Sequence, residues 1–500
     1  MKLVLAVFLA GVLLELALHY IPALWRARKV VAVLCVVLTA FACDSIALWK
    51  PNVCSVLIGI IGLYRVFNYL RIAEGRMHEG YLRRATRRTS LLLIAFQAVI
   101  ALYWLAWHAY EPSAQVAWLV VTLAQCGVAA LLLVSTIRSL RHTAWPARTT
   151  HISDADLPTV TVAVPARNET EDLQACLESL IGCDYPKLEI IVLDDCSQTK
   201  RTPEIIRGYA HDGVRFIQGN EPLETWLAKN QAYDRLADEA SGEYIVFAGV
   251  DTRFGRSSIR QLVELLTAKR KQMISVLPYR SDSVQHQNAL AQAMRYFWEL
   301  VPPRRLFNRP PVLSSCWIIQ SSALGKAGGF EAVSRAIVPE AHFAKRLVAT
   351  DGYSFMRSSR EAGIESVKSL VDQWDTAVRT RYPQLHRRPE NVVAAALAVA
   401  LFLLLPYLLA VSGYFLHIGA FAIVLAAIAT VLLTATFWLM NTAVRTGNIV
   451  LALIGMPAGA LYDLWLLHYS MWQYEFSTVE WKGRNVCIPA MHVIPHLPKI

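Results

Sequence analysis

Residues 188–197 read LEIIVLDDCS, and this stretch decides the fold of the central part of the chain. Leu188–Leu193 is a nearly continuous apolar run, which is typical of a parallel strand covered on both faces. The run ends abruptly in Asp194 and Asp195. Two adjacent carboxylates at a strand end are costly unless they meet donors such as a base, a ribose or a metal ion. A solvated turn is the alternative interpretation.

The segments on either side of this strand alternate between strand and helix patterns. Val160, Val162 and Val164 alternate as in a strand, and residues 171–181 have apolar side chains at helical spacing. Further strands are expected at 214–217 and 244–248, with helices at 226–240 and 257–269. Alternating strands and helices predict a three-layer α/β domain.

Five short polar stretches punctuate this domain. They are PARNE at 165–169, LDDCS at 193–197, WLAKN at 226–230, VDTR at 250–253 and PEAH at 339–342. The first, second and fourth stand just past the end of a predicted strand. Open α/β sheets bind their ligands beyond the carboxyl ends of the strands, so we expect these three stretches to meet at one site.

Three side chains of these stretches have specific chemical interpretations. Asp251 could hold Mg²⁺ or Mn²⁺ bridging two phosphate oxygens, or cap the following helix. Lys229 could place a positive charge near the same diphosphate, or be solvated. Glu340 could act as a general base toward a hydroxyl, or complement the dipole of a following helix. The chain contains no glycine-rich phosphate loop, which excludes the common ATPase motif.

The rest of the chain reads as a membrane body, because 55% of its 500 residues are hydrophobic. Apolar runs long enough to cross a bilayer stand near residues 3–24, 30–49, 52–70, 91–110 and 116–137 before the α/β domain, and 392–412 and 418–440 after it. The net charge of +11 comes with basic residues clustered beside these runs. Anionic lipid headgroups, and not nucleic acid, are therefore the expected partner.

The distribution of Arg and Lys in short loops places the amino terminus outside and the α/β domain in the cytoplasm. We expect a membrane domain at 1–140 with about five transmembrane helices, the α/β domain at 150–390, a second membrane domain at 391–470 and a tail at 471–500. The sequence GMPAG at 455–459 interrupts the apolar segment 449–469, which favours a re-entrant or interfacial hairpin and a cytoplasmic tail. The nine cysteines are expected to be reduced thiols.

On these motifs, the α/β domain resembles the GT-A (Rossmann-like nucleotide-diphospho-sugar transferase) domain of membrane-bound family 2 glycosyltransferases. Within this family, the domain especially resembles membrane-bound, non-processive enzymes similar to ceramide glucosyltransferases and to the hopanoid and carotenoid glycosyltransferases. The resemblance covers residues 157–390 and the tail motif VEWKGR at 479–484. It implies nucleotide-sugar binding and transfer to an acceptor. The residues that inherit binding roles are Pro165, Arg167, Asn168, Glu169, Asp194, Asp195, Lys229, Asn230, Arg381, Trp481 and Arg484.

The chain departs from the family pattern at two positions. The metal-binding Asp-x-Asp falls on Gly249, Val250 and Asp251, so only the second carboxylate remains. The catalytic Asp falls on Glu340, preceded by Pro339. Three functions stay open: an inverting transferase that moves a sugar, expected from UDP, to a lipid hydroxyl; a nucleotide-binding scaffold; and a processive polysaccharide synthase. The Gln-x-x-Arg-Trp element of processive synthases is absent, and Arg381-Tyr382 resembles it only faintly.

Overall fold

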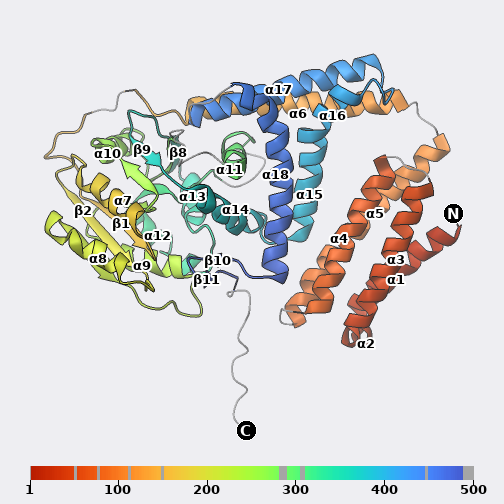
Figure 1. Cartoon of the computed structure of the whole chain (residues 1–500), viewed down its shortest axis with the longest axis horizontal. Helices are drawn as coiled ribbons and strands as arrows, with labels where there is room; N and C mark the ends of the chain where they lie inside the picture. The colour runs from red at the N-terminus through yellow and green to blue at the C-terminus, as the bar shows by residue number, and fades with distance from the viewer. Residues whose placement is uncertain are drawn as a thin grey trace, which may run out of the picture.

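The computed structural model describes residues 2–49, 53–75, 79–110, 114–147, 151–280, 290–303, 310–444 and 449–487. Figure 1 shows the α/β domain on one side of α15 (Pro389–Val399) and α18 (Ile449–Phe476), and the helices up to residue 110 on the other. The α/β domain is thus bounded by helices from both ends of the chain, as the sequence predicts.

A mixed seven-stranded sheet forms the centre of the α/β domain, in the order β3-β2-β1-β4-β7-β6-β8. All neighbouring strands are parallel except at β7, which runs antiparallel to both β4 and β6. The strands are β1 (Val160–Ala166), β2 (Leu188–Asp194), β3 (Val214–Gln218), β4 (Tyr244–Ala248), β6 (Met273–Leu277), β7 (Cys316–Gln320) and β8 (Tyr353–Arg357). The two-stranded pair β5 (Thr252–Phe254) and β9 (Ile364–Ser366) lies beside it.

Helices cover both faces of this sheet, which confirms the three-layer arrangement. The helices of the domain are α7 (Glu171–Ile181), α8 (Arg201–Gly208), α9 (Ala228–Glu239), α10 (Ser258–Ala268), α11 (Leu290–Leu300), α12 (Ser321–Lys326), α13 (Glu340–Val348) and α14 (Leu370–Gln384). Along β1, Val162 and Val164 point to one core, with α7 and α10, whereas Ala163 points to the other, with α9 and α13. This alternation is the expected period of two.

The second of these cores continues out of the domain. Met294 and Phe297 of α11 are buried, and the same cluster includes Phe437 and Met456 of the carboxyl-terminal helices. The sheet therefore packs through α11 onto the apolar helices. This continuity fixes the sheet against the membrane body.

The remaining helices are largely apolar and differ in length. They are α1 (Lys2–Tyr20), α2 (Pro22–Arg26), α3 (Arg28–Trp49), α4 (Val53–Glu74), α5 (Glu79–Tyr110) and α6 (Ala114–His142) before the domain, and α15 (Pro389–Val399), α16 (Leu405–Ser412), α17 (Ala420–Val444) and α18 (Ile449–Phe476) after it. Among the residues that the structure describes, five segments are long and apolar enough to cross a membrane: Arg28–Ile46, Cys54–Glu74, Gln115–His142, Pro389–Ser412 and Ala420–Val444. These coincide with five of the expected runs.

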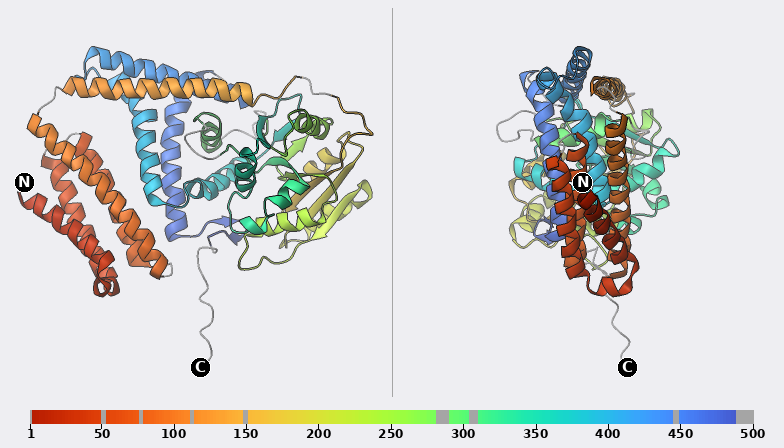
Figure 2. Two further views of the ribbon diagram at one scale, coloured as in Figure 1. Left: turned by 180° about the vertical axis from the view of Figure 1, so that it is seen from behind. Right: turned by 90° about the vertical axis from the view of Figure 1, so that its right-hand side faces the viewer.

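The candidate spans do not share one direction. Figures 1 and 2 show α6 and α17 packed together along the top of the molecule, crosswise to α15 and α18. The change of direction occurs at a π-helical turn, Ala400–Leu404, followed by Pro406. Gln125 Nε2 of α6 donates to the Leu401 carbonyl at 2.8 Å, which satisfies a backbone group at the bend. All five spans therefore cannot stand perpendicular to one membrane plane.

The interruption expected at 455–459 does not form, because Ile449–Phe476 is one continuous helix that contains Pro457. The glycines serve close packing instead. A Cβ atom at Gly455 would lie 2.8 Å from Phe437 Cε1, and one at Gly459 would lie 2.9 Å from Met294 Sδ. The sequence pattern predicts a break because a glycine at a helix contact cannot be distinguished from a glycine at a turn until the neighbouring helices are known.

Candidate active site

The carboxyl ends of β1, β2 and β4 lie next to one another, as the order of the sheet requires. Ala166 is the register partner of Asp194, so the PARNE and LDDCS stretches leave the sheet side by side. Asn168 and Cys196 have positive φ angles of 50° and 51°, and both loops turn sharply there. Three of the predicted stretches are therefore brought to one edge.

Hydrogen bonds between these two loops use several of the predicted binding residues. Arg167 Nη1 donates to the carbonyl of Asp195 at 2.6 Å. The amide of Asn168 donates to Ser197 Oγ at 2.9 Å, and Asp194 Oδ1 accepts from the amide of Ser197 at 3.3 Å. Arg167, Asn168 and Asp194 thus shape the loops around Asp195.

A short hairpin from the carboxyl-terminal tail lies over this edge. We call it the tail hairpin; it consists of β10 (Glu480–Trp481), β11 (Arg484–Asn485) and the two residues between them. Lys482 and Gly483 have φ angles of 49° and 75°, the conformation of a two-residue type I′ turn, which glycine favours at its second position. The Lys-Gly pair in the sequence therefore specifies this tight turn.

Ion pairs fix the tail hairpin to the sheet edge. Arg484 Nη1 donates to both carboxylate oxygens of Asp195 at 2.7 Å. Lys482 Nζ lies 3.1 Å from Glu169 Oε1, and its carbonyl accepts from Arg167 Nε at 3.0 Å. Burial raises the pKa of the Asp195 and Glu169 carboxyls in spite of their cationic partners. These contacts join the PARNE stretch, the LDDCS stretch and the tail motif VEWKGR.

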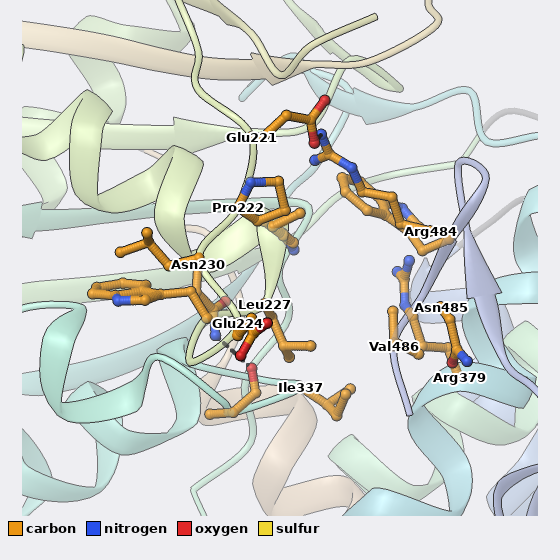
Figure 3. A pocket seen from close by; sticks show the side chains of 16 residues that line it. Glu221, Pro222, Glu224, Leu227, Asn230, Ile337, Arg379, Arg484, Asn485 and Val486 are labelled. Carbon is orange, nitrogen blue, oxygen red and sulfur yellow. Dashed lines mark hydrogen bonds and ion pairs between the residues drawn. The ribbon is translucent and has the colours of Figure 1, made fainter. Parts of the chain in front are cut away.

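Two adjoining cavities of about 330 Å³ each open beside the tail hairpin. The central cavity reaches the sheet edge at Pro165, Glu169 and Asp251. The outer cavity lies between the WLAKN stretch and the tail hairpin, and Figure 3 shows Leu227 and Asn230 on one side of it and Arg484 and Val486 on the other. Its wall combines apolar and charged groups.

Lys229, Arg379 and Trp481 line both cavities. Lys229 stands in the first turn of α9 with its Nζ 5.0 Å from the ring centre of Tyr233. The guanidinium of Arg379 lies over Trp481 at 5.5 Å. Burial, with neighbouring cations, lowers the pKa of Lys229 to about 8 and also lowers the pKa of Arg379. The junction of the cavities is therefore a site of concentrated positive charge.

Asp251 lies in the central cavity and already has a cationic partner. Its Oδ2 is 3.5 Å from Nζ of Lys368, which also lines this cavity. Lys368 precedes the cap of α14, where Ser369 Oγ accepts from the amide of Asp372 at 3.1 Å. The Asp251 carboxylate folds back over Gly249, so that a Cβ atom at Gly249 would lie 2.5 Å from Asp251 Oδ1.

Glu340 is fully buried at the first turn of α13. Neither of its carboxylate oxygens has a hydrogen-bond partner among the described residues. The negative charge of Glu340 stabilises the charged form of Lys229. Asn230 Nδ2 holds the preceding loop by donating to the carbonyls of Val333 and Ala336, both at 2.8 Å. Glu340 does not line either cavity, but its charge acts on Lys229, which lines both.

The α/β domain is similar in sequence to known glycosyltransferases. Residues 161–328 match the family model described as glycosyl transferase family 2. The chain carries a glycosyl transferase family 2 domain. Over 99 residues it is 32% identical to the glycosyltransferase AglE of Haloferax volcanii, and over 111 residues 25% identical to the teichuronic acid biosynthesis glycosyltransferase TuaG of Bacillus subtilis.

These relatives are matched over part of their length. The matched regions are 19% and 22% of this chain and 31% and 42% of AglE and TuaG, respectively. A solved mannosyltransferase, PcManGT from Pyrobaculum calidifontis in complex with GDP-Man and Mn²⁺, is 18% identical, with a TM-score of 0.41. That alignment covers 71% of this chain and 96% of the mannosyltransferase.

The family 2 domain does not present a ready ligand set for a divalent cation at Asp251. No group of three or more His, Cys, Asp or Glu side chains suited to a metal occurs in the described part of the chain. Gly249 contributes no carboxylate, and Lys368 lies against the one that remains. Mg²⁺ and Mn²⁺ prefer several oxygen ligands, which a single paired carboxylate does not supply.

Five of the predicted binding residues line neither of the two cavities: Arg167, Asn168, Asp194, Asp195 and Arg381. Asp195 lines a smaller cavity of about 120 Å³ instead. Arg381 Nη2 donates to Asp463 Oδ2 of α18 at 2.6 Å, and its guanidinium lies over Trp298. Arg379, two residues earlier on α14, lines both cavities instead. Both arginines lie in the same stretch of sequence, and only the orientation of α14 decides which one reaches the cavities.

Proposed function

We propose that the protein is an inverting glycosyltransferase that moves a single sugar from a nucleotide-diphosphate sugar, expected to be a UDP-sugar, to a hydroxyl group of a membrane lipid. The observation that carries the proposal is the central cavity of the family 2 domain. It joins the strand-end loops at Pro165 to Glu169 and at Gly249 to Asp251 to five cationic residues: Lys229, Arg295, Lys368, Arg379 and Lys482. Lys482 is paired with Glu169, and Lys368 lies beside Asp251. Cations there suit a diphosphate, which requires charge-assisted hydrogen bonds.

In this proposal the nucleoside contacts the sheet edge at Pro165, Glu169 and Asp195, and the diphosphate extends toward Lys229. The acceptor enters through the outer cavity, whose apolar wall at Leu227, Ile337 and Val486 suits part of a lipid. The acceptor oxygen forms the new bond to the anomeric carbon. The bond from that carbon to the phosphate oxygen breaks, and the nucleoside diphosphate leaves with the electron pair. One displacement inverts the configuration at the anomeric carbon.

Glu340 takes the proton of the acceptor hydroxyl in this scheme. A buried carboxylate without hydrogen-bond partners in the described residues is costly to maintain, and such groups occur where they serve chemistry. Since Glu340 lines neither cavity, the proposal requires the acceptor hydroxyl to reach it past Lys229, the cavity residue on which its charge acts. In this scheme Lys229 stands between the base and the departing diphosphate, and its positive charge attracts both of these negative groups.

The reaction is proposed at the cytoplasmic face of the cell membrane, with the tail hairpin on the same side as the family 2 domain. The loop between α16 and α17 would then face outward. In intact cells Ser477→Cys should resist a membrane-impermeant thiol reagent and react after permeabilisation, whereas Tyr414→Cys should react in both. Both positions are exposed, and the parent protein gives the background from native thiols. Labelling of Ser477→Cys in intact cells would place the tail outside.

Release of UDP by the purified full-length protein tests the proposed activity. A UDP-sugar should yield UDP only when extracted membrane lipid is added, and radiolabelled sugar should appear in the lipid fraction. UDP binding without transfer to any lipid would favour the alternative, a nucleotide-binding scaffold. A polymeric product would instead support a processive synthase.

A further inference from the structure

Resting on the proposed function, we propose that Lys368, together with Lys229 and Arg379, supplies the positive charge that the donor diphosphate requires, so that the donor binds without a divalent cation. We call these three residues the cationic cluster. Lys368 takes the place of a metal ion against Asp251. This inference opposes the expectation of Mg²⁺ or Mn²⁺ that the family resemblance raises.

The first support is the geometry at the end of β4. An acid at position 249 would normally share a metal ion with Asp251, but here the Asp251 carboxylate fills that space. Its Oδ1 stands 2.5 Å from where a Cβ of residue 249 would be, and its Oδ2 turns to Lys368 at 3.5 Å. A divalent cation would have to displace the ammonium group and would gain one protein carboxylate there. Such an exchange is poorly compensated for ions that need about six oxygen ligands.

The second support is the charge of the cluster. Each member is disfavoured by burial and by other cations: Arg379 lies among the charges that act on both Lys229 and Lys368. Asp251 is the carboxylate that most favours the charged form of Lys368, and Glu340 is the carboxylate that most favours the charged form of Lys229. Carboxylates also line this cavity, at Glu169, Asp172, Asp251, Asp372, Asp375 and Glu480. Where the three cations meet, a bound anion would offset their mutual repulsion. A diphosphate between the three side chains meets this need.

The third support is the position of Lys229 on α9. A cation in the first turn of a helix opposes the helix dipole, and α9 has no side-chain cap, since Leu227 occupies the cap position. The first turn of α9 (Ala228, Lys229 and Asn230) lines the outer cavity, and Lys229 lines both cavities. Together they are suited to phosphate oxygens. The proposal thus assigns the helix terminus and the cationic cluster to one ligand.

Calorimetric titration of UDP into the full-length protein in detergent tests this inference. The wild-type protein should bind UDP with similar affinity in EDTA and in excess Mn²⁺, and Mn²⁺ alone should give no binding heat. A wild-type affinity that rises tenfold or more with Mn²⁺ would overturn the inference and leave the proposed function intact. Failure to bind UDP in either condition would instead overturn the proposed function.

The UDP affinity of Lys368 variants tests the role of this residue directly. In EDTA, Lys368→Ala should bind UDP roughly ten- to hundredfold more weakly, the usual loss for a charged hydrogen bond. Mn²⁺ should restore part of that loss, because Asp251 is then free. Lys368→Gln, which keeps a donor near Asp251 without the charge, should show the same loss and serves if the alanine variant does not fold. The exposed Lys345→Ala is the matched control and should bind like wild type. Wild-type affinity in both Lys368 variants would contradict the inference.

Discussion

Glu340→Gln is expected to lower sugar transfer by roughly 10²- to 10⁴-fold, the usual contribution of a positioned general base, while UDP affinity is retained. The amide preserves the shape of the buried side chain and removes only the proton acceptor. The change also removes a charge that favours protonation of Lys229, whose pKa is about 8. Affinity should therefore be compared at a pH well below 8, where Lys229 stays charged in both proteins.

The design includes two further variants. Glu340→Asp restores the residue type that the family carries, and it should keep measurable transfer if the pocket closes by about one methylene group. Glu331→Gln changes an exposed carboxylate nine positions earlier and should transfer like wild type. If wild type and Glu340→Gln both bind UDP-sugar and neither transfers to lipid, the scaffold alternative stands and the transferase proposal fails.

The sheet edge could be predicted from the sequence because local patterns determine it. Leu188–Asp194 and Tyr244–Ala248 form strands with the expected bounds, and α7 spans the predicted residues 171–181. Each strand end is marked by a polar stretch directly after an apolar run. The order of strands then follows from short connections between parallel neighbours, so the first, second and fourth stretches had to meet.

The cationic cluster and the tail hairpin contacts could not be predicted in the same way. Lys368 and Asp251 are far apart in the chain and meet because β5 pairs with β9 just before Lys368. Arg484 was expected near the site by resemblance, but its partner Asp195 depends on how the tail folds back from α18. Charges on loops carry no periodicity, so their pairing appears only in three dimensions.

Glu340 marks a different limit. Its chemistry could be proposed from the residue type and its place before a helix, yet full burial without hydrogen-bond partners in the described residues is a property of the packed domain. The aromatic rings of Phe330, Phe343 and Trp317 pack in that region. An unpaired carboxylate costs more free energy in apolar surroundings than in water. A short stretch of sequence does not reveal such surroundings.

Asp195→Ala is the other variant with a large expected effect. The change removes both acceptors of Arg484 Nη1, a pair in which the Asp195 side chain is 4% exposed and the Arg484 side chain 14% exposed. We expect UDP affinity to fall roughly ten- to hundredfold, because a charged hydrogen-bond acceptor at the nucleoside position is lost. Calorimetric titration of UDP measures the loss, with the exposed Asp212→Ala as a matched control.

The same variant should loosen the tail hairpin, and a comparison with Arg484→Ala separates the two roles of Asp195. Trypsin cleaves after Lys482 and Arg484, whose side chains are paired in the folded protein, so both variants should release a carboxyl-terminal fragment sooner than wild type. If Asp195 binds the nucleoside directly, Asp195→Ala must lose more UDP affinity than Arg484→Ala. If Asp195 acts only by holding the tail hairpin, the two single variants and the double variant will lose the same amount, because each breaks one shared contact. Equal losses would therefore remove Asp195 from the nucleoside site and leave the tail hairpin, with Trp481 over Arg379, as the part of the cavity wall that it supports.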